Sequence, residues 1–264
     1  MIIDAHVHIS LYENNAQSLD EVFDLLLLEM KKNKIEAAII IPDNIERSDD
    51  IADIGRATEL IGKRKNLFLL GSPQIIQRGS SELEKYSQLL KSRKIKGLKF
   101  FPGHDPYYPS DKRCWPYYKL CEELNFPIIF HTGENSGNSE CAKWNDPKYI
   151  IKVAKKYPHL KVIITHYFWP KLDYCYEITK DVPNIYFELA ALADKEVIEK
   201  SGGIDKMKEI LTKTIHDRPN QIIFGTDWPM CSIKSHINLI RSLKLNKIIE
   251  DKILFYNAKV IYKI

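Results

Sequence analysis

A strand-then-helix pattern recurs along the whole chain and restricts the possible folds more than any other feature. Short segments rich in β-branched and apolar residues alternate with longer segments whose apolar residues recur at helical spacing. Strands are expected at residues 2–8, 36–41, 66–71, 95–100, 127–131, 161–166, 184–189 and 221–227. Helices are expected near residues 18–32, 49–63, 80–93, 114–124, 147–157, 171–181, 195–215, 234–243 and 247–262. Such alternation indicates a parallel sheet, because each helix returns the chain to the edge where the next strand begins.

The number of strand–helix units indicates how this sheet closes. Segments such as 37–41 (Ala-Ala-Ile-Ile-Ile) are apolar on both faces, which indicates a sheet that is covered on both sides. Eight such units in about 250 residues match the size of a (β/α)8 TIM barrel. A doubly wound open sheet is the alternative, but no Gly-x-Gly-x-x-Gly motif follows the first strand. No linker or shift in composition divides the chain, so we predict one α/β barrel domain over residues 1–264.

Composition and charge exclude several classes of protein. The chain is 44% hydrophobic and 28% charged with a net charge of +4, which is typical of a globular protein without a basic nucleic-acid surface. No apolar run reaches the roughly 18 residues of a membrane helix, and no signal segment is expected at the start. The five cysteines lack CxxC spacing, which favours free thiols in a reducing compartment. We therefore predict a cytoplasmic protein that binds neither nucleic acid nor membrane.

Most of the expected strands end in a titratable residue. In a parallel barrel these carboxyl ends meet at one rim, which is where the chemistry of such barrels takes place. Ordinary strand cores rarely end in titratable groups this often, so the set carries more weight than any single member. The residues concerned are His6, His8, Lys99, His131, His166, Glu188 and Asp227.

Two histidines of the first strand begin a candidate metal site. His6 and His8 are two residues apart, so on a strand their side chains point to the same face. Together with His131 and Asp227 they offer three imidazoles and one carboxylate to a single divalent ion. We predict Zn first, with Mn, Fe or Co as alternatives. A catalytic metal that keeps an open position lowers the pKa of a water towards about 7.

Other readings of these residues stay open at this point. His166 is either a further ligand or a hydrogen-bond donor to the reacting oxygen. Each histidine alone is also explained by an ordinary core or rim position, and Asp227 by a helix N-cap, although the Trp228-Pro229 that follows does not resemble a helix start. Asp4 shares the parity of His6, and we interpret it as buried structural support, since a buried carboxylate needs partners.

The same positions carry a resemblance to a known family. The chain resembles the amidohydrolase superfamily, and within it the amidohydrolase-related (amidohydrolase-2) family, over nearly its whole length and in the right order. The matching motifs are Asp4-Ala5-His6-Val7-His8, Gly97-Leu98-Lys99, His131-Thr132-Gly133, Thr165-His166, Gly225-Thr226-Asp227-Trp228-Pro229 and Asn257-Ala258. The resemblance implies a metal-dependent TIM-barrel enzyme, usually a hydrolase and sometimes a decarboxylase or hydratase. It also implies that His6, His8, His131 and Asp227 are ligands, and that His166 is a catalytic residue or a further ligand.

Lys99 stands where some dinuclear relatives carboxylate a lysine and others place a glutamate. We expect an unmodified Lys99 that binds an anionic group of the substrate. The alternative is an ion pair inside the barrel with Glu188 or Asp4. A missing glutamate also disfavours a TatD-type nuclease.

Aromatic residues gather in the loops beside these strand ends, and we predict that Trp228 contacts substrate. They either form walls for a cyclic or aromatic substrate or pack the rim or a homodimer contact. The aromatic residues are Tyr107, Tyr108, Trp115, Tyr117, Tyr118, Tyr167, Phe168, Trp169 and Trp228. Further candidates on the same side are His104, Arg113, Glu134, Lys171 and His236. By contrast, His159 and His216 are placed on the opposite rim or the outside.

Three functions are consistent with this site. The first is a metal-dependent hydrolase of a C–N or C–O bond in a small molecule, of the amide, lactone or ester type, in which Asp227 takes the proton of the attacking water. Its close rival is a lyase that decarboxylates or hydrates a carboxylic acid. The third is a non-catalytic barrel whose coordination shell is closed.

Overall fold

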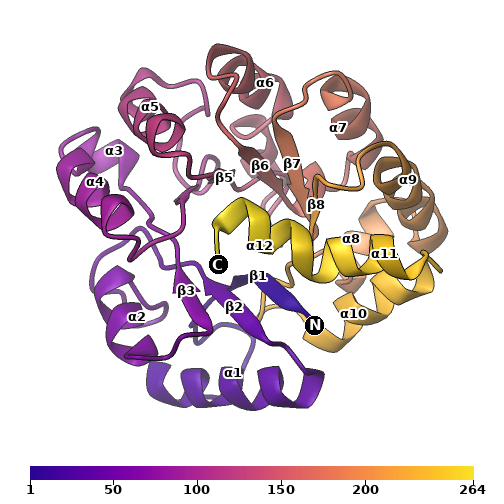
Figure 1. The fold of residues 1–264 in the computed structure, drawn as a ribbon, viewed down its shortest axis with the longest axis horizontal. Helices are drawn as coiled ribbons and strands as arrows, with labels where there is room; N and C mark the ends of the chain where they lie inside the picture. The colour runs from indigo at the N-terminus through magenta and orange to yellow at the C-terminus, as the bar shows by residue number, and fades with distance from the viewer.

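The computed structural model describes all residues from Met1 to Ile264 and consists of parallel strands surrounded by helices (Figure 1). The strands are β1 (Ile3–Val7), β2 (Ala37–Ile40), β3 (Leu67–Leu69), β4 (Leu98–Phe100), β5 (Ile128–Phe130), β6 (Val162–Thr165), β7 (Ile185–Glu188) and β8 (Ile222–Ile223). The helices are α1 (Leu19–Asn33), α2 (Ile54–Ile61), α3 (Ile75–Arg78), α4 (Leu83–Lys91), α5 (Trp115–Leu124), α6 (Pro147–Lys156), α7 (Leu172–Thr179), α8 (Lys195–Lys200), α9 (Ile204–Asp217), α10 (Ile233–Ser242), α11 (Lys247–Asp251) and α12 (Asn257–Tyr262).

The strands form a closed barrel. Strands β1 to β3 pair in parallel, as do β4 to β8, each in sequence order. Two further parallel bridges, Gly71 with Leu98 and Val7 with Trp228, join these two sets. Backbone hydrogen bonds support both junctions, with Lys99 N–H donating to the Gly71 carbonyl (2.7 Å) and His8 N–H donating to the Trp228 carbonyl (2.7 Å). The predicted (β/α)8 barrel is therefore confirmed, and the open doubly wound sheet is wrong.

Helix boundaries follow local capping signals. Ser18 caps α1 by accepting a hydrogen bond from the Glu21 N–H, and Lys34 ends that helix in a left-handed conformation. Helix α2 starts later than expected, because Asp53 caps it. Over 195–215, where one long helix or two were expected, the chain forms two, α8 and α9, which are separated by Gly202 and Gly203 at φ 92° and 94°.

The barrel interior is apolar at one end and polar at the other. One buried cluster combines inward residues such as Ile39, Ile129 and Ile163 with Phe255 and Tyr262 from the C-terminal helical segment. That segment lies across the barrel opening that faces the viewer in Figure 1. Its Asn257 side chain donates to carbonyls just before and at the start of β8, so it covers the amino ends of the strands. The carboxyl ends are therefore left to form the site.

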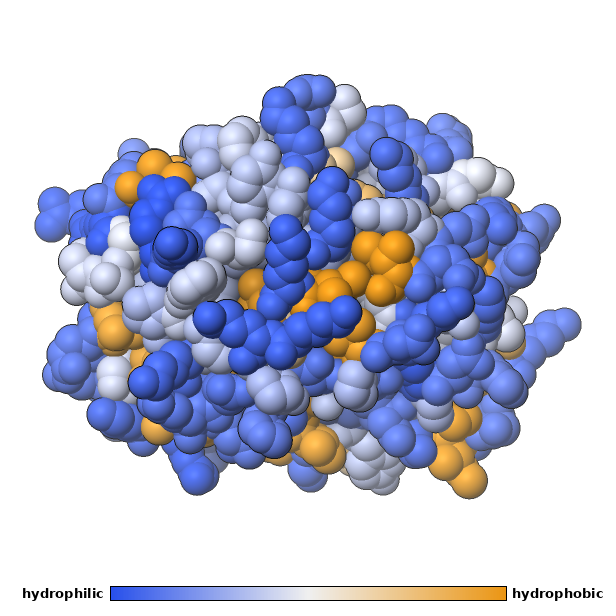
Figure 2. Space-filling model, turned by 90° about the horizontal axis from the view of Figure 1, so that it is seen from above, coloured by the Kyte–Doolittle hydropathy of each residue, from blue (hydrophilic) through white to orange (hydrophobic).

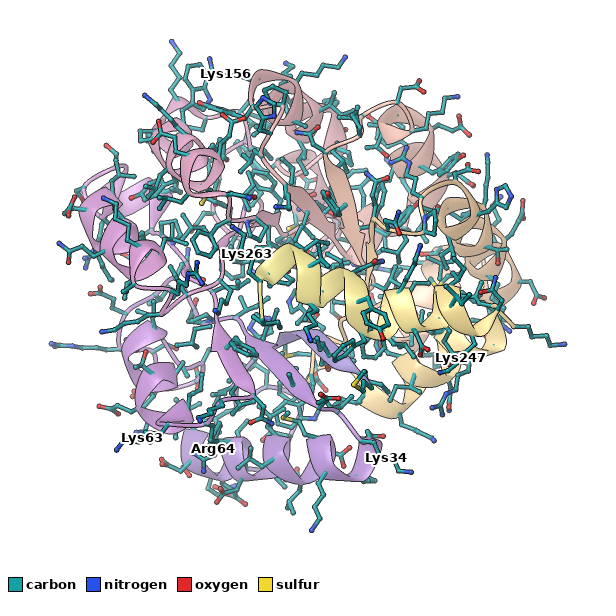
Figure 3. All side chains as sticks on the ribbon, in the orientation of Figure 1. Lys34, Lys63, Arg64, Lys156, Lys247 and Lys263 are labelled. Carbon is teal, nitrogen blue, oxygen red and sulfur yellow. The ribbon has the colours of Figure 1, made fainter.

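The outer surface is largely polar. The face seen in Figure 2 is mostly hydrophilic, with a small hydrophobic area near its middle and separate hydrophobic spots towards its edges. Basic side chains such as Lys63, Lys156 and Lys247 project from separate parts of the helix ring (Figure 3). None of the helices combines the length and the apolar character that crossing a bilayer requires.

Gly71 is the tightest point at the β3–β4 junction, and we expect Gly71→Ala to destabilise the barrel. An added Cβ would lie 2.6 Å from the Tyr86 ring and 2.8 Å from Leu98 Cδ2, and both neighbours are buried. Overpacking of this kind costs about 1–3 kcal/mol of unfolding free energy, which urea denaturation measures. Gly55→Ala is the control, since its Cβ meets only Asp53 Oδ1 at 3.3 Å. Equal stability of the two variants would contradict the prediction.

Candidate metal centre

A cavity of about 1150 Å³ opens at the carboxyl ends of the strands. Residues from the loops after many different strands line it, as expected for the catalytic end of such a barrel. Six of the seven titratable residues at the strand ends are among its lining residues, namely His6, His8, Lys99, His131, His166 and Asp227. The exception among the predicted titratable residues is Glu188, which lies behind His6.

The first strand is irregular where it contributes to the site. The register between β1 and β2 shifts between Asp4 and Val7, which is the mark of a β-bulge. The regular alternation of side chains along a strand therefore does not by itself explain the positions of His6 and His8. Asp4 is fully buried and binds the Thr226 N–H (3.0 Å) and hydroxyl (2.7 Å), which ties β1 to the end of β8. Burial raises the pKa of Asp4 to about 7, and the residue supports the structure as the sequence indicated.

Three acceptor atoms converge on the cavity floor. His6 Nε2 lies 3.1 Å from His8 Nε2 and 3.2 Å from Asp227 Oδ1, and His8 Nε2 lies 3.4 Å from the same oxygen. A tetrahedral ion with bonds of about 2.0–2.1 Å would separate its ligand atoms by roughly 3.3 Å. Asp227 reaches this position from a left-handed conformation (φ 71°), held by its N–H bond to the His6 carbonyl (2.9 Å).

The far nitrogen of each imidazole is already occupied. His8 Nδ1 lies 2.9 Å from the Ile41 carbonyl, which can only accept, so a neutral His8 ring carries its lone pair on Nε2, towards the cluster. His6 Nδ1 contacts Glu188 Oε1, and Gly225 leaves room for this pair, since a Cβ there would lie 2.9 Å from the His6 Cβ. A carbonyl and a carboxylate behind the imidazoles are the usual partners of metal-ligating histidines.

The charges of the cluster also suit a cation. Burial lowers the pKa of His6 well below its usual value, so its imidazole is neutral and able to ligate. Burial alone would raise the pKa of Asp227, but positive charge at the neighbouring imidazoles, His6 first, lowers it well below the usual range. With His6 and His166 neutral, a cation bound among these groups would supply that positive charge. Burial raises the pKa of Glu188 to about 8, so a cation nearby would help to ionise this carboxyl group. The residues present therefore fit a divalent metal ion.

His131 and His166 complete the floor. Their ring centres are 4.9 Å apart, and that of His166 is 5.2 Å from that of His6. His131 is 6% exposed, and its Nε2 is buried without a hydrogen-bond partner. His166 Nδ1 lies 3.1 Å from the Ala190 carbonyl, which can only accept, so the neutral ring carries a lone pair on Nε2. Burial lowers the pKa of His166. Its geometry therefore favours a ligand or base over a hydrogen-bond donor.

Comparison with known proteins agrees with this geometry. The sequence model of a family described as "Amidohydrolase" matches residues 3–264. The chain belongs to the amidohydrolase family. This confirms the resemblance seen in the sequence, and it identifies the protein as an enzyme of a metal-dependent type that includes hydrolases and lyases. No curated protein matches the sequence.

Solved structures share the fold of this amidohydrolase. An uncharacterised TIM-barrel protein from Bordetella bronchiseptica is 20% identical, with a TM-score of 0.78 over 98% of this chain and 97% of that one. An amidohydrolase from Burkholderia multivorans is 13% identical, with a TM-score of 0.74 over 100% and 99% of the two chains. A dihydroxybenzoic acid decarboxylase from Polaromonas with bound manganese is 15% identical, with a TM-score of 0.63 over 94% and 86%.

Lys99 reaches the amidohydrolase cavity without a carboxylate partner. Its side chain is 1% exposed, and Nζ donates to Thr165 Oγ1 at 3.4 Å. It forms no ion pair with Glu188 or Asp4, which was the alternative interpretation of this residue. Burial lowers the pKa of Lys99 to about 8. The ammonium group therefore remains available to a ligand.

Several aromatic and polar candidates lie elsewhere. Trp228, predicted to contact substrate, is 8% exposed, belongs to the buried core cluster and is not among the residues that line the cavity, so its contact with substrate stays a prediction. Tyr107, Tyr117 and Tyr118 are likewise buried in the core, which is the packing alternative. The aromatic residues that line the cavity are Tyr12, Phe101 and Trp169.

Some of the remaining histidines and charged candidates line the cavity, and others do not. His104 and Glu134 line the cavity, whereas Arg113 and Lys171 do not. Both nitrogens of the buried His236 have backbone partners, Ser232 O and Ala193 N–H, which is a structural role.

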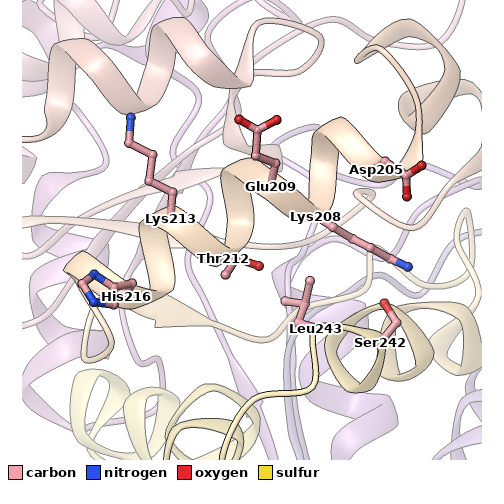
Figure 4. Close-up of a pocket in the computed structure, with 8 residues that line it drawn as sticks. All are labelled: Asp205, Lys208, Glu209, Thr212, Lys213, His216, Ser242 and Leu243. Atoms are coloured by element: carbon pink, nitrogen blue, oxygen red, sulfur yellow. The ribbon is translucent and has the colours of Figure 1, made fainter.

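A second hollow, of about 630 Å³, lies on the outside of the barrel along α9 and the end of α10 (Figure 4). It contains His216, in agreement with the prediction that this residue lies outside the site. None of its lining residues is buried, so it is a solvated helix surface.

Proposed function

We propose that this amidohydrolase is a hydrolase that uses one divalent ion, zinc first, to cleave a C–N or C–O bond of a small amide, lactone or ester. His6, His8, His131 and Asp227 would hold the ion. The convergence of two imidazole nitrogens and one carboxylate oxygen within 3.1–3.4 Å at the floor of a deep cavity supports the proposal. The ion would act as a Lewis acid and lower the pKa of a water to about 7.

The residues around the ion have separable roles in this proposal. Asp227 takes the proton from the attacking water, because it is ionised and lies at the floor of the cavity. The Lys99 ammonium group donates to the oxygen of the substrate on which negative charge develops. His166 Nε2, which carries a lone pair, serves as a further ligand or as a second base.

The substrate proposed from these residues is a small molecule with an anionic or strongly polar reacting end and a cyclic body. Lys99 favours negative charge at the floor, and the rings of Phe101 and Trp169 line the wall. All five cysteines are free, which supports the proposed cytoplasmic location.

A lyase is the second candidate. A buried lysine without a carboxylate of its own, Lys99, would bind the carboxyl group of an acid that is decarboxylated or hydrated. The manganese-containing decarboxylase from Polaromonas has this fold. A non-catalytic metal-binding barrel is the third candidate, since His131 and His166 lie beside the three converging ligand atoms and would be enough to close a coordination shell.

The purified protein should contain about one equivalent of divalent metal per chain after incubation with Zn or Mn and dialysis. Elemental analysis measures this, and intact mass measures whether Lys99 is free of a carboxyl adduct. Assays on a panel of lactones, esters, amides and carboxylic acids then distinguish hydrolysis, which releases an acid, from decarboxylation, which releases CO₂. Protein without metal after both incubations would contradict the site, while two equivalents with a carboxylated Lys99 would indicate a dinuclear enzyme.

A further inference from the structure

The sides of the cavity above the metal centre differ in character. One side, formed by α8 and the loop after β5, is charged, because Lys200 Nζ lies 3.3 Å from Glu134 and 2.9 Å from Glu196. Another side is formed by the loops after β8, β1 and β2, which are neighbouring strands of the barrel. Several apolar side chains of these loops line the cavity, and we call them the apolar rim. They are Tyr12, Ile45, Ile51 and Met230.

Two members of the apolar rim are exposed although they are large. Tyr12 is 52% exposed and Ile45 is 57% exposed. Other large hydrophobic side chains of the chain are exposed too, but among them only these two line the cavity. Ile51 and Met230 are half buried on the same side. Single exposed apolar residues are ordinary, whereas apolar residues gathered at a cavity are typical of a surface that a ligand covers.

The loops that carry Tyr12 and Ile45 are joined to each other near the cavity. Ser10 and Ile51 form an antiparallel bridge, and the Leu11 N–H donates to the Asp50 carbonyl (2.8 Å). The Tyr12 N–H donates to Ser10 Oγ (3.1 Å), which fixes the backbone at the exposed ring. The apolar rim is therefore held in place before a ligand arrives, and less ordering entropy is lost when one binds.

Carboxylates beside the apolar rim restrict the charge of the group that it accepts. Glu13 follows Tyr12 in the sequence, Asp43 lies two residues before Ile45, and both carboxylates line the cavity. They repel an anionic group at this position. The exposed apolar area of Tyr12 and Ile45 offers hydrophobic contact to an alkyl chain or a ring. The group that suits this side is therefore apolar and carries no negative charge.

We propose that the substrate carries an uncharged apolar group, an alkyl chain or a ring, that binds at the apolar rim while its reacting carbonyl group lies at the metal centre. The position of the carbonyl group rests on the proposed function. The rim and the metal centre line one continuous cavity of about 1150 Å³. This exceeds the roughly 300–1,000 Å³ of most small-molecule pockets, so a substrate that extends from the floor to the mouth has room. An amide, lactone or ester with an extended apolar part is the expected substrate class.

Hydroxamic acids of different chain length test the apolar rim separately from hydrolysis. Acetohydroxamic, octanohydroxamic and 6-aminohexanohydroxamic acid are titrated by calorimetry into the metal-loaded and the metal-free enzyme. Each buried methylene group strengthens binding by about fourfold, so the octano compound should bind at least about thirtyfold more tightly than the aceto compound in both forms. Tyr12→Ser/Ile45→Ser should reduce this ratio at least about tenfold, and each single variant at least about threefold. Binding of the aceto compound should change less than threefold, because it is too short to reach the rim from the floor.

Tyr256→Ser/Ile248→Ser is the matched control, since it removes a tyrosine that is 49% exposed and an isoleucine that is 71% exposed, both outside the cavity. It should keep the ratio within threefold. Equal binding of the octano and aceto compounds, or an unchanged ratio in the Tyr12/Ile45 variant, would overturn the proposal. Tighter binding of the cationic 6-aminohexano compound than of the octano compound would overturn the uncharged class.

Sedimentation tests the other occupant of the apolar rim, a second copy of the chain. A wild-type dimer that Tyr12→Ser/Ile45→Ser converts into a monomer would overturn the proposal, because the two side chains would then be covered by the partner. The same sedimentation profile in both proteins supports it. A dependence on chain length without hydrolysis of any amide, lactone or ester leaves the apolar rim standing and counts against the proposed function alone.

Discussion

Replacing His6 and His8 together with alanine should abolish metal binding while the barrel stays folded. The metal content is expected to fall from about one equivalent to below a tenth, as measured by elemental analysis. The reason is geometric: these two imidazoles supply two of the three atoms that lie within 3.1–3.4 Å of one another. Asp227 and His131 would remain, and of these only Asp227 belongs to the converging cluster, so the two would hold a divalent ion weakly.

The fold should survive because most of its stability comes from elsewhere. Both side chains lie at the end of β1, while the apolar clusters extend through the barrel interior and between strands and helices. Circular dichroism and thermal melting check this. His6→Asn/His8→Asn repeats the test with side chains that fill more of the space left by the two imidazoles, including the space next to Glu188.

The control for this experiment is His159→Ala/His216→Ala, which removes the same number of imidazoles away from the cavity. This variant should keep its full metal content. Full occupancy in the His6/His8 variant would show that the ligands lie elsewhere, while loss of metal in the control would show that adventitious surface binding had been measured.

The sequence predicted the barrel because strand and helix periods are local properties. Alternating segments need only neighbouring residues to be recognised, and the crossover rule then makes the sheet parallel. The closure at Gly71–Leu98 and Val7–Trp228 and the bulge near Asp4 were beyond such reasoning. They depend on contacts between residues that are far apart in the sequence.

The site was predictable to a similar extent. Strand ends converge in any parallel barrel, so His6, His8 and Asp227 were expected to meet. The position of Trp228 in the core cluster was beyond the sequence, because a loop residue next to a strand end turns either to the cavity or to the core, and only the path of the loop decides. Glu188 was expected as a strand end and as an alternative ion-pair partner of Lys99, and its contact with His6 became visible when β7 and β1 were both in place.

Asp227→Asn is expected to have the largest effect on turnover. Asparagine has the size of aspartate and keeps one side-chain oxygen, so the variant should retain part of its metal through His6, His8 and His131. It lacks basicity, because an amide does not take a proton from water at neutral pH. The rate on the best substrate of the panel should fall by about 10²- to 10⁴-fold, the usual contribution of a general base.

Metal content and rate must be measured on the same samples, because loss of the ion would also abolish turnover. Glu199→Gln, which removes an exposed carboxylate of the same cavity, is the control and should change the rate less than threefold. A loss of kcat that persists when Asp227→Asn is saturated with metal assigns proton transfer to Asp227. Near-normal turnover in that variant would assign proton transfer to His166 instead. The Nε2 of His166 is another basic atom of the cavity floor, and the contact of its Nδ1 with the Ala190 carbonyl holds the ring in place.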